Sequence, residues 1–146
     1  MQNVLQRNTN VTPHTIQLTA TIVGSEIVVS GNGAANLPAN SGAHRFAFSL
    51  ASPDGVTVRF ESLDTQDNCS TCPPASGENS KQIVAVHIGP NGDTAGFTDN
   101  NSNHDAMDVS YQWNFSCSEP SLQVQPFDPI IRNGGTTGIA ATTPGL

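Results

Sequence analysis

The feature that most constrains the fold of this chain is a strict alternation of apolar and polar side chains in residues 109–117. Apolar residues stand at every odd position of this run and polar residues at every even position. Successive side chains of a β-strand point to opposite faces of a sheet, so this period of two predicts a strand with one buried face. The run holds the only tryptophan and the only tyrosine of the chain. We therefore expect Tyr111 and Trp113 to lie in the core.

Shorter runs of alternating or apolar residues predict further strands along the chain. They lie at 16–22, 26–30, 46–50, 56–60, 83–88, 122–124 and 127–131. The Ser-Pro-Asp-Gly sequence at 52–55 is typical of a tight turn, and it predicts that 46–50 and 56–60 form a β-hairpin. Residues 83–88 carry apolar side chains on both faces, which predicts a central strand that is covered on both sides.

The fold class follows from the number and spacing of these strands. No stretch of the chain carries the apolar stripe of a helix, and turn residues separate roughly seven or eight short strands. The pattern predicts a single-domain, all-β fold, a two-sheet antiparallel β-sandwich. Its topology is expected to be an immunoglobulin-like or a cupredoxin-like Greek key, two topologies that the sequence does not separate. The expected core consists of Phe46, Phe48, Val58, Phe60, Val84, Val86, Tyr111, Trp113 and Phe115.

The ends of the chain differ from the predicted strands. The β-sandwich domain is expected to occupy residues 1–132, and residues 133–146 are rich in Gly and Thr, which is typical of a flexible tail. Sheet edges carry unpaired main-chain donors and acceptors that recruit extended segments. We therefore expect a homo-oligomer in which residues 139–146, or the first ten residues, lie along a sheet edge of another copy.

The charge of the chain restricts its partners. Twelve Asp and Glu against five Lys and Arg leave a formal net charge of −7. Such a surface repels nucleic-acid phosphates and anionic lipid headgroups, so we expect an acidic, soluble protein that binds neither nucleic acid nor membrane. No apolar run reaches the roughly 20 residues that span a bilayer. The first ten residues do not resemble a secretory signal, so we expect a cytoplasmic protein, or else a secreted mature form whose leader has been removed.

The most conspicuous short motif is Cys69-Ser-Thr-Cys72, which two prolines follow. A thioredoxin-type centre needs its first cysteine at a helix N-terminus, and a structural zinc site usually adds a second pair of ligands. Neither pattern accompanies Cys69 and Cys72. A disulfide that closes the local loop, or two free thiols, is therefore favoured over a metal site or a redox centre. Cys117 shares the inward face of Trp113 and is expected to be a small core side chain.

The best candidate ligand loop precedes the strand at 109–117. Oxygen-bearing side chains stand at every second position of its first part, and a further carboxylate follows; the candidate ligands are Asp99, Asn101, Asn103, Asp105 and Asp108. Carboxylate and amide oxygens in a curled loop can converge on a hard cation, so calcium is the candidate metal. The comparison with an EF-hand fails, because His104 replaces the turn glycine and no glutamate closes the loop. The alternative is an Asx-rich turn before a strand, and no cofactor is then required.

Two spaced dipeptides near the C-terminal end carry a family resemblance. Glu119-Pro120 and Asp128-Pro129, together with the chain length and the all-β pattern, resemble the DP-EP family of small bacterial proteins. The resemblance implies a bacterial β-sandwich of unknown function, and it brings no catalytic residues. Proline fixes φ and removes a ladder donor, so we expect each dipeptide at a strand end or a sheet edge.

The function remains open among two classes of binding protein. His44 shares the inward face of Phe46 and is expected to be a core-edge histidine with a hydrogen-bond partner. No serine, cysteine or carboxylate is placed beside a histidine so as to predict a catalytic triad. We interpret the chain as a non-enzymatic β-sandwich binding or assembly module, whose small-molecule or glycan ligand the sequence does not identify. The alternative is a calcium-dependent, lectin-like carbohydrate-binding module, because residues 98–108 resemble the calcium loop of small bacterial β-sandwich lectins.

Overall fold

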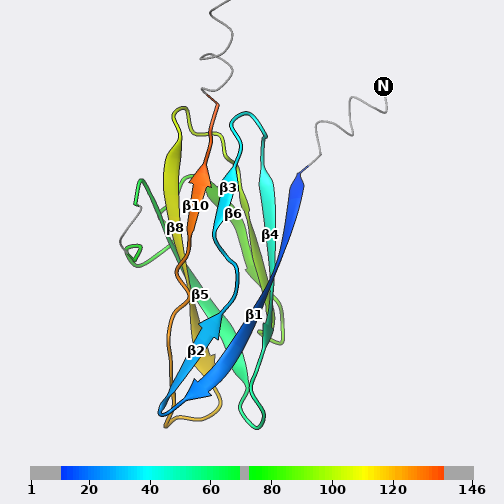
Figure 1. The fold of residues 1–146 in the computed structure, drawn as a ribbon, viewed down its shortest axis with the longest axis vertical. Coiled ribbons are helices and arrows are strands. Elements are labelled where there is room, and N and C mark those ends of the chain that lie inside the picture. The colour runs from blue at the N-terminus through cyan, green and yellow to red at the C-terminus, as the bar shows by residue number, and fades with distance from the viewer. Residues whose placement is uncertain (1–10, 70–72, 137–146) are drawn as a thin grey trace, which may run out of the picture.

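The computed structural model describes residues 11–69 and 73–136 of the chain (Figure 1). Within these residues the fold is all-β, with ten strands and no helix, as the alternating pattern predicts. The strands are β1 (Thr12–Val23), β2 (Glu26–Ser30), β3 (Ala35–Leu37), β4 (His44–Ala51), β5 (Val58–Asp67), β6 (Ile83–Ile88), β7 (Thr94–Asp99), β8 (Met107–Cys117), β9 (Gln123–Val124) and β10 (Ile130–Asn133).

The strands form two sheets that pack into a β-sandwich. One sheet has six strands in the order β6-β7-β4-β1-β2-β9, and the other has four in the order β3-β10-β8-β5. The predicted two-sheet sandwich is therefore confirmed. The sheets are mixed rather than purely antiparallel, since β1 runs parallel to β4, β2 to β9 and β3 to β10. Parallel neighbours need a long connection, and the chain between β1 and β4 supplies one that includes a strand of each sheet.

The expected hairpin between β4 and β5 is wrong. The two strands lie in different sheets, so residues 52–57 cross from one layer to the other (Figure 1). Both strands point their apolar residues into the same core, where the rings of Phe48 and Phe60 meet edge to face with centroids 6.4 Å apart. Alternation specifies which side chains face inward, but it does not specify which strand lies alongside.

The expected central position of β6 is also wrong. This strand is an edge of the six-stranded sheet, and 39% of Val84 and 36% of Ile88 is exposed. The pairing with β7 is irregular between Val84 and His87, where Ala85 has a φ of 55°. The neighbouring β7 is the inner strand, and its Phe97 is completely buried. The sequence pattern missed β7, because this strand has a single large apolar side chain.

The core between the sheets is aromatic. Of the nine expected core residues, six are buried; they are Phe46, Phe48, Val58, Phe60, Tyr111 and Trp113. Val86 and Phe115 are partly buried, whereas Val84 is exposed. Trp113 lies at the centre, with the rings of Phe60 and Phe48 edge-on at centroid distances of 4.9 and 5.5 Å. Edge-to-face packing suits the charge distribution of aromatic rings and adds to the free energy of burial.

The packed part of the chain extends beyond residue 132. β10 ends at Asn133, which is completely buried, and Gly134 N donates to Leu37 O at 2.8 Å. Thr136 N donates to Asn103 O at 2.9 Å. The domain therefore includes residues up to Thr136, whereas residues 137–146 of the expected tail lie outside the described residues.

Both proline dipeptides stand at strand ends, as expected. Glu119-Pro120 follows the last residue of β8, and Asp128-Pro129 precedes the first residue of β10. Pro129 O accepts a hydrogen bond from Tyr111 N at 3.2 Å. Asp128-Pro129 therefore joins the sheet through a carbonyl acceptor, and the N–H group that proline lacks is not needed for this bond.

Candidate functional site

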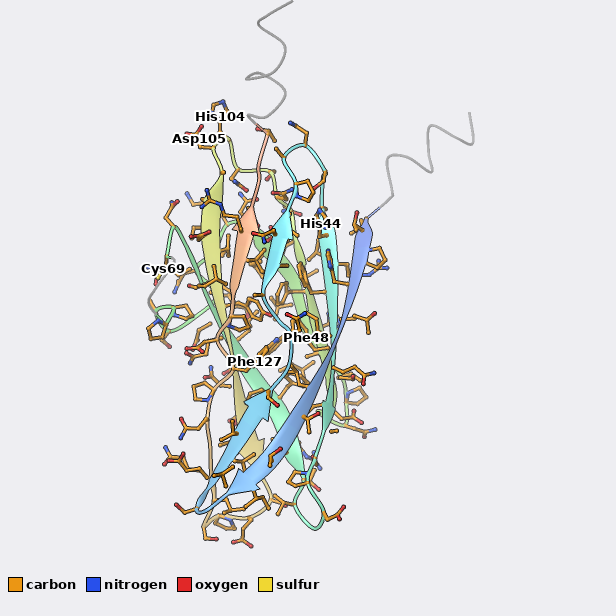
Figure 2. All side chains as sticks on the ribbon, in the orientation of Figure 1. His44, Phe48, Cys69, His104, Asp105 and Phe127 are labelled. Carbon is orange, nitrogen blue, oxygen red and sulfur yellow. The ribbon has the colours of Figure 1, made fainter. Side chains whose placement is uncertain are left out.

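A group of connected polar side chains lies at one end of the sandwich. We call it the end cluster; it consists of the buried His44, Asp99, Asn101 and Asn133 together with the exposed Ser41. It forms where β4 begins and where β7 and β10 end, because strands of both sheets stop at the same level there. Figure 2 shows His44 near this end of the molecule, with His104 and Asp105 at the tip of the adjoining β7–β8 loop.

Asp99 is the buried carboxyl group of the end cluster. Its Oδ1 accepts hydrogen bonds from Asn101 N at 2.9 Å and from Asn133 Nδ2 at 2.8 Å. Its Oδ2 has no hydrogen-bond partner among the described residues. Burial raises the pKa of Asp99 to about 6, the two hydrogen bonds oppose this rise, and the charge of Asp67 adds to it.

Asn101 joins three segments of the chain. Its Nδ2 lies 3.2 Å from each of three acceptors, which are Pro38 O, Ser41 Oγ and Gly42 O. Its Oδ1 accepts a hydrogen bond from Gly135 N at 2.9 Å. Its φ of 49° lies in the left-handed region, which asparagine tolerates better than most residues. Asn101 is thus a structural link rather than a free ligand.

Two histidines and a serine form a hydrogen-bonded chain beside Asn101. His44 Nε2 lies 2.7 Å from Ser41 Oγ, and His44 Nδ1 lies 2.9 Å from His14 Nε2. The expectation of a buried His44 with a partner is confirmed, and a serine that the sequence did not place lies beside it. Ser41 Oγ donates to Pro38 O at 2.7 Å. The same hydroxyl oxygen thus contacts both His44 Nε2 and Pro38 O, and it links the loop before β4 to the histidine pair.

The two histidine rings are held in a largely apolar setting. His14 stacks on Phe46 with a centroid distance of 4.5 Å and an interplanar angle of 8°. Burial lowers the pKa of His14, and it lowers the pKa of His44, on which His14 has a further lowering effect. Both rings are therefore neutral near pH 7.

The five residues of the expected calcium loop do not converge on one point. Asp99 and Asn101 belong to the end cluster, and Asn103 Oδ1 accepts from Asn133 Nδ2 at 3.0 Å. The side chain of Asp105 is 87% exposed beside His104 (Figure 2). Asp108 pairs with Arg132 at 3.2 Å. In the ranges that the structure describes, no three His, Cys, Asp or Glu side chains are grouped as metal ligands.

Asn133 is the member of this site that sequence reasoning missed. It stood at the start of the expected flexible tail, where an asparagine before two glycines is typical of a loop. The structure places it as the last residue of β10, completely buried. Its position beside Asp99 depends on the packing of two sheets, so no local signal could have revealed it.

The cysteines fall in two different settings. Cys69 is disulfide-bonded and buried, whereas Cys72 lies outside the described residues. Cys117 is a free thiol at the end of β8, partly buried against the core, and its Sγ lies 3.2 Å from Glu119 O.

A second candidate site opens between the edge strands of the two sheets. We call it the β5–β6 cleft; it has a volume of about 500 Å³ and is lined by residues 61–64, 76–78 and 86–88. On either side of it, other segments cover the edge of β5. Phe60 N donates to Gly92 O at 2.8 Å, and Thr65 N donates to Gly77 O at 2.9 Å. Between these two contacts, residues 61–64 face the cleft.

The lining of the β5–β6 cleft is acidic and partly apolar. It holds the carboxylates of Glu61, Asp64 and Glu78, and no lysine or arginine of the described residues lines it. Asp64 is anchored, because its Oδ1 accepts from Gly77 N at 2.8 Å and its Oδ2 from Asn114 Nδ2 at 3.0 Å. Glu61 and Glu78 are exposed, and within the described residues neither forms an ion pair, so their charges face solvent. The apolar part of the lining consists of Leu63, Val86 and Ile88.

Comparisons with known proteins give little further information. No model of a known protein family matches the chain, and no curated protein is similar to it. Among solved structures, the inclusion body protein PixA from Burkholderia cenocepacia J2315 is similar over 88% of this chain and 99% of its own, at 8% identity and a TM-score of 0.36. So weak a likeness supports no argument about function, and the resemblance to the DP-EP family stays a prediction. No helix in the described ranges is long and apolar enough to cross a membrane.

Proposed function

We propose that this protein is a non-enzymatic assembly module, in which the β5–β6 cleft of one copy binds the first ten residues of another. The observation that carries the proposal is the cleft itself, which lies between two strand edges and is lined by three carboxylates and by no lysine or arginine among the residues described. The chain thereby offers a recognition surface for an extended, basic segment.

The shape of the cleft favours an extended occupant. β5 and β6 are each the last strand of a sheet, and an exposed edge can add a further strand through main-chain hydrogen bonds. Val86 and Ile88, which are at least partly exposed, supply apolar contacts for side chains of such a strand. A compact ligand would leave most of these contacts unused.

The charge of the cleft favours a basic occupant. Residues 1–10 contain Arg7 and neither aspartate nor glutamate, in a chain of net charge −7. Residues 139–146 carry no charged side chain, so they lack this complementarity. Exposed ion pairs contribute only about 0.2–1 kcal/mol each, so charge here selects the segment while main-chain pairing supplies most of the affinity.

The lectin-like alternative has less support. It would use residues 99–108 as a loop that binds calcium and sugar. The side chain of Asp105, however, is exposed beside His104, whereas that of Asp108 pairs with Arg132. We therefore keep the assembly module as the proposed function.

The test measures binding of a labelled peptide of residues 1–10 to a chain of residues 11–146 by fluorescence anisotropy at low salt. We expect saturable binding that weakens about 3–10-fold when Arg7 of the peptide is replaced by Glu, because an attraction becomes a repulsion. The double substitution Glu61→Gln and Glu78→Gln should weaken binding of the unmodified peptide by a similar factor.

The matched control replaces two exposed carboxylates far from the cleft, Glu26→Gln with Asp105→Asn, at the same change of net charge. This control should bind the peptide as tightly as the unmodified chain. Equal weakening by both double substitutions would indicate a general charge effect and would contradict the cleft as the binding site.

A further inference from the structure

The edge of β5 that faces away from β8 is covered on either side of Leu63. Phe60 N donates to Gly92 O at 2.8 Å, and Thr65 N donates to Gly77 O at 2.9 Å. Alternate residues of a strand direct their main-chain groups to the same edge. Leu63 stands two positions before Thr65, so its main-chain groups face the same edge, between the two covered positions.

The pairing of β5 with β8 agrees with this orientation. Leu63 lies opposite Trp113, and Trp113 N donates to Phe127 O at 2.8 Å, on the side of β8 that faces away from β5. The two residues therefore form a pair that exchanges no main-chain hydrogen bonds. Among the described residues, neither N nor O of Leu63 has a hydrogen-bond partner.

These unpaired groups belong to a residue that is only 3% exposed. The great majority of buried main-chain groups in native proteins are paired. Leu63 lines the β5–β6 cleft, so its N–H and C=O are open to a group that enters there. An extended peptide supplies one main-chain acceptor and one donor at the spacing of a strand pair, which is the complement that Leu63 lacks.

We propose that the segment bound in the β5–β6 cleft pairs with Leu63 through two main-chain hydrogen bonds, and that residues 5–7 of the other copy form the core of this contact. The inference rests on the proposed function and names the part of the N-terminal segment that is recognised. The covered positions leave residues 61–64 of β5 open, which is about 13 Å of strand at about 3.3 Å per residue. Only three or four residues of the other copy therefore fit.

The side chains of the first ten residues select this core. Arg7 is the only charged residue among them, and its charge complements the carboxylates of Glu61 and Glu78. Leu5 stands two positions before Arg7, so in an extended segment the two side chains lie on the same face. Leu5 is thereby available to contact Ile88, which is 36% exposed on the β6 side of the cleft.

The first experiment measures amide hydrogen exchange by nuclear magnetic resonance in a chain of residues 11–146, which contains all ten described strands. In the free chain, the Leu63 amide should exchange about tenfold faster than the amides of Phe60 and Thr65, which are bonded to Gly92 O and Gly77 O. A saturating amount of the peptide of residues 1–10 should slow exchange at Leu63 by about tenfold and leave the two reference amides unchanged. The full chain, which carries the segment itself, should show the same protection.

The outcomes of this experiment separate the inference from the proposed function. A peptide that binds by fluorescence anisotropy without slowing exchange at Leu63 overturns the inference and leaves the proposed function standing. Protection at Ile88 without protection at Leu63 also overturns it, because the segment would then pair with the edge of β6. A peptide that does not bind refutes the proposed function and the inference with it.

The second experiment locates the core with peptides of residues 1–10 that carry one N-methyl group on the main chain. A strand directs every second N–H group toward one neighbour, so methylation should weaken binding about tenfold either at Gln6 or at Leu5 and Arg7, but not at all three. Methyl groups at Gln2 and Thr9 are the matched controls and should leave binding unchanged. Equal loss at every position, or no loss within residues 5–7, would overturn these residues as the core.

Discussion

His14 and His44 share one hydrogen bond, His44 is buried and His14 is partly buried, and this combination links the stability of the fold to pH. Burial lowers the pKa of each ring below the ordinary value of 6.5. A base with a lowered pKa binds fewer protons in the folded than in the unfolded chain. The stability that the neutral pair contributes is therefore fully present above pH 6.5, and it is lost as the pH falls below that value.

The histidine pair makes a prediction that calorimetry can check. Between pH 7.5 and pH 5.5, Tm of the unmodified chain should fall more than Tm of His14→Gln, in which one of the two titrating rings is absent. Identical slopes for His14→Gln and the unmodified chain would show that the histidine pair does not titrate between these pH values.

Trp113 is the residue whose loss should damage the core most. It is completely buried among aromatic rings, and truncation to alanine leaves a large cavity. We expect Trp113→Ala to lower the free energy of unfolding by about 3–5 kcal/mol in a urea titration. Val23→Ala, at a position that is 57% exposed, should change it by less than about 0.5 kcal/mol. A loss below about 1 kcal/mol for Trp113→Ala would contradict its central place.

Trp113→Phe separates the effect of the ring from that of its polar atom. Trp113 Nε1 is buried without a hydrogen-bond partner in the described ranges, so phenylalanine removes an unsatisfied donor along with part of the ring. The loss should therefore be clearly smaller for Trp113→Phe than for Trp113→Ala.

At the scale of elements, the loss of unfolding free energy on substitution depends more on where a strand lies in its sheet than on how apolar its sequence is. β6 is an edge strand with Val84 exposed, and β7 is an inner strand with Phe97 buried against Tyr111 and Phe46. The irregular pairing of β6 also fits its place, since bulges are typical of sheet edges.

This difference between the strands is measurable. Val84→Ala should lower the free energy of unfolding by less than about 1 kcal/mol, because the side chain gives up little buried area. Phe97→Ala should lower it by about 3–5 kcal/mol. Comparable losses for the two variants in urea would mean that β6 is covered on both faces, as its apolar sequence first indicates.

At the scale of the whole molecule, the proposed assembly predicts how mass in solution depends on the chain ends. Multi-angle light scattering of the full chain should give a mass above that of the monomer of 15.2 kDa. A chain of residues 11–146 should be monomeric, whereas a chain of residues 1–136 should still assemble. Truncation after Thr136 preserves Asn133 and the hydrogen bonds of Gly134 and Gly135. A monomeric full chain would refute the assembly module.

The positions and inward faces of most strands could be read from the sequence alone. The run at 109–117 is β8 with Trp113 inside, and the runs at 26–30 and 46–50 lie in β2 and β4. These strands could be predicted because a period of two and the turn residues around it depend only on neighbouring positions of the chain, and not on contacts between distant residues.

Neighbour relations and the candidate sites were decided only by the tertiary structure. Residues 46–50 and 56–60 have the pattern of a hairpin, yet they pack across the core, because burial of Phe48 against Phe60 is satisfied equally well from opposite sheets. Asn133 meets Asp99 although 34 positions separate them in the chain. The ends of β7 and β10 come together only when the two sheets pack, so the contact between these residues depends on long-range burial that no local pattern encodes.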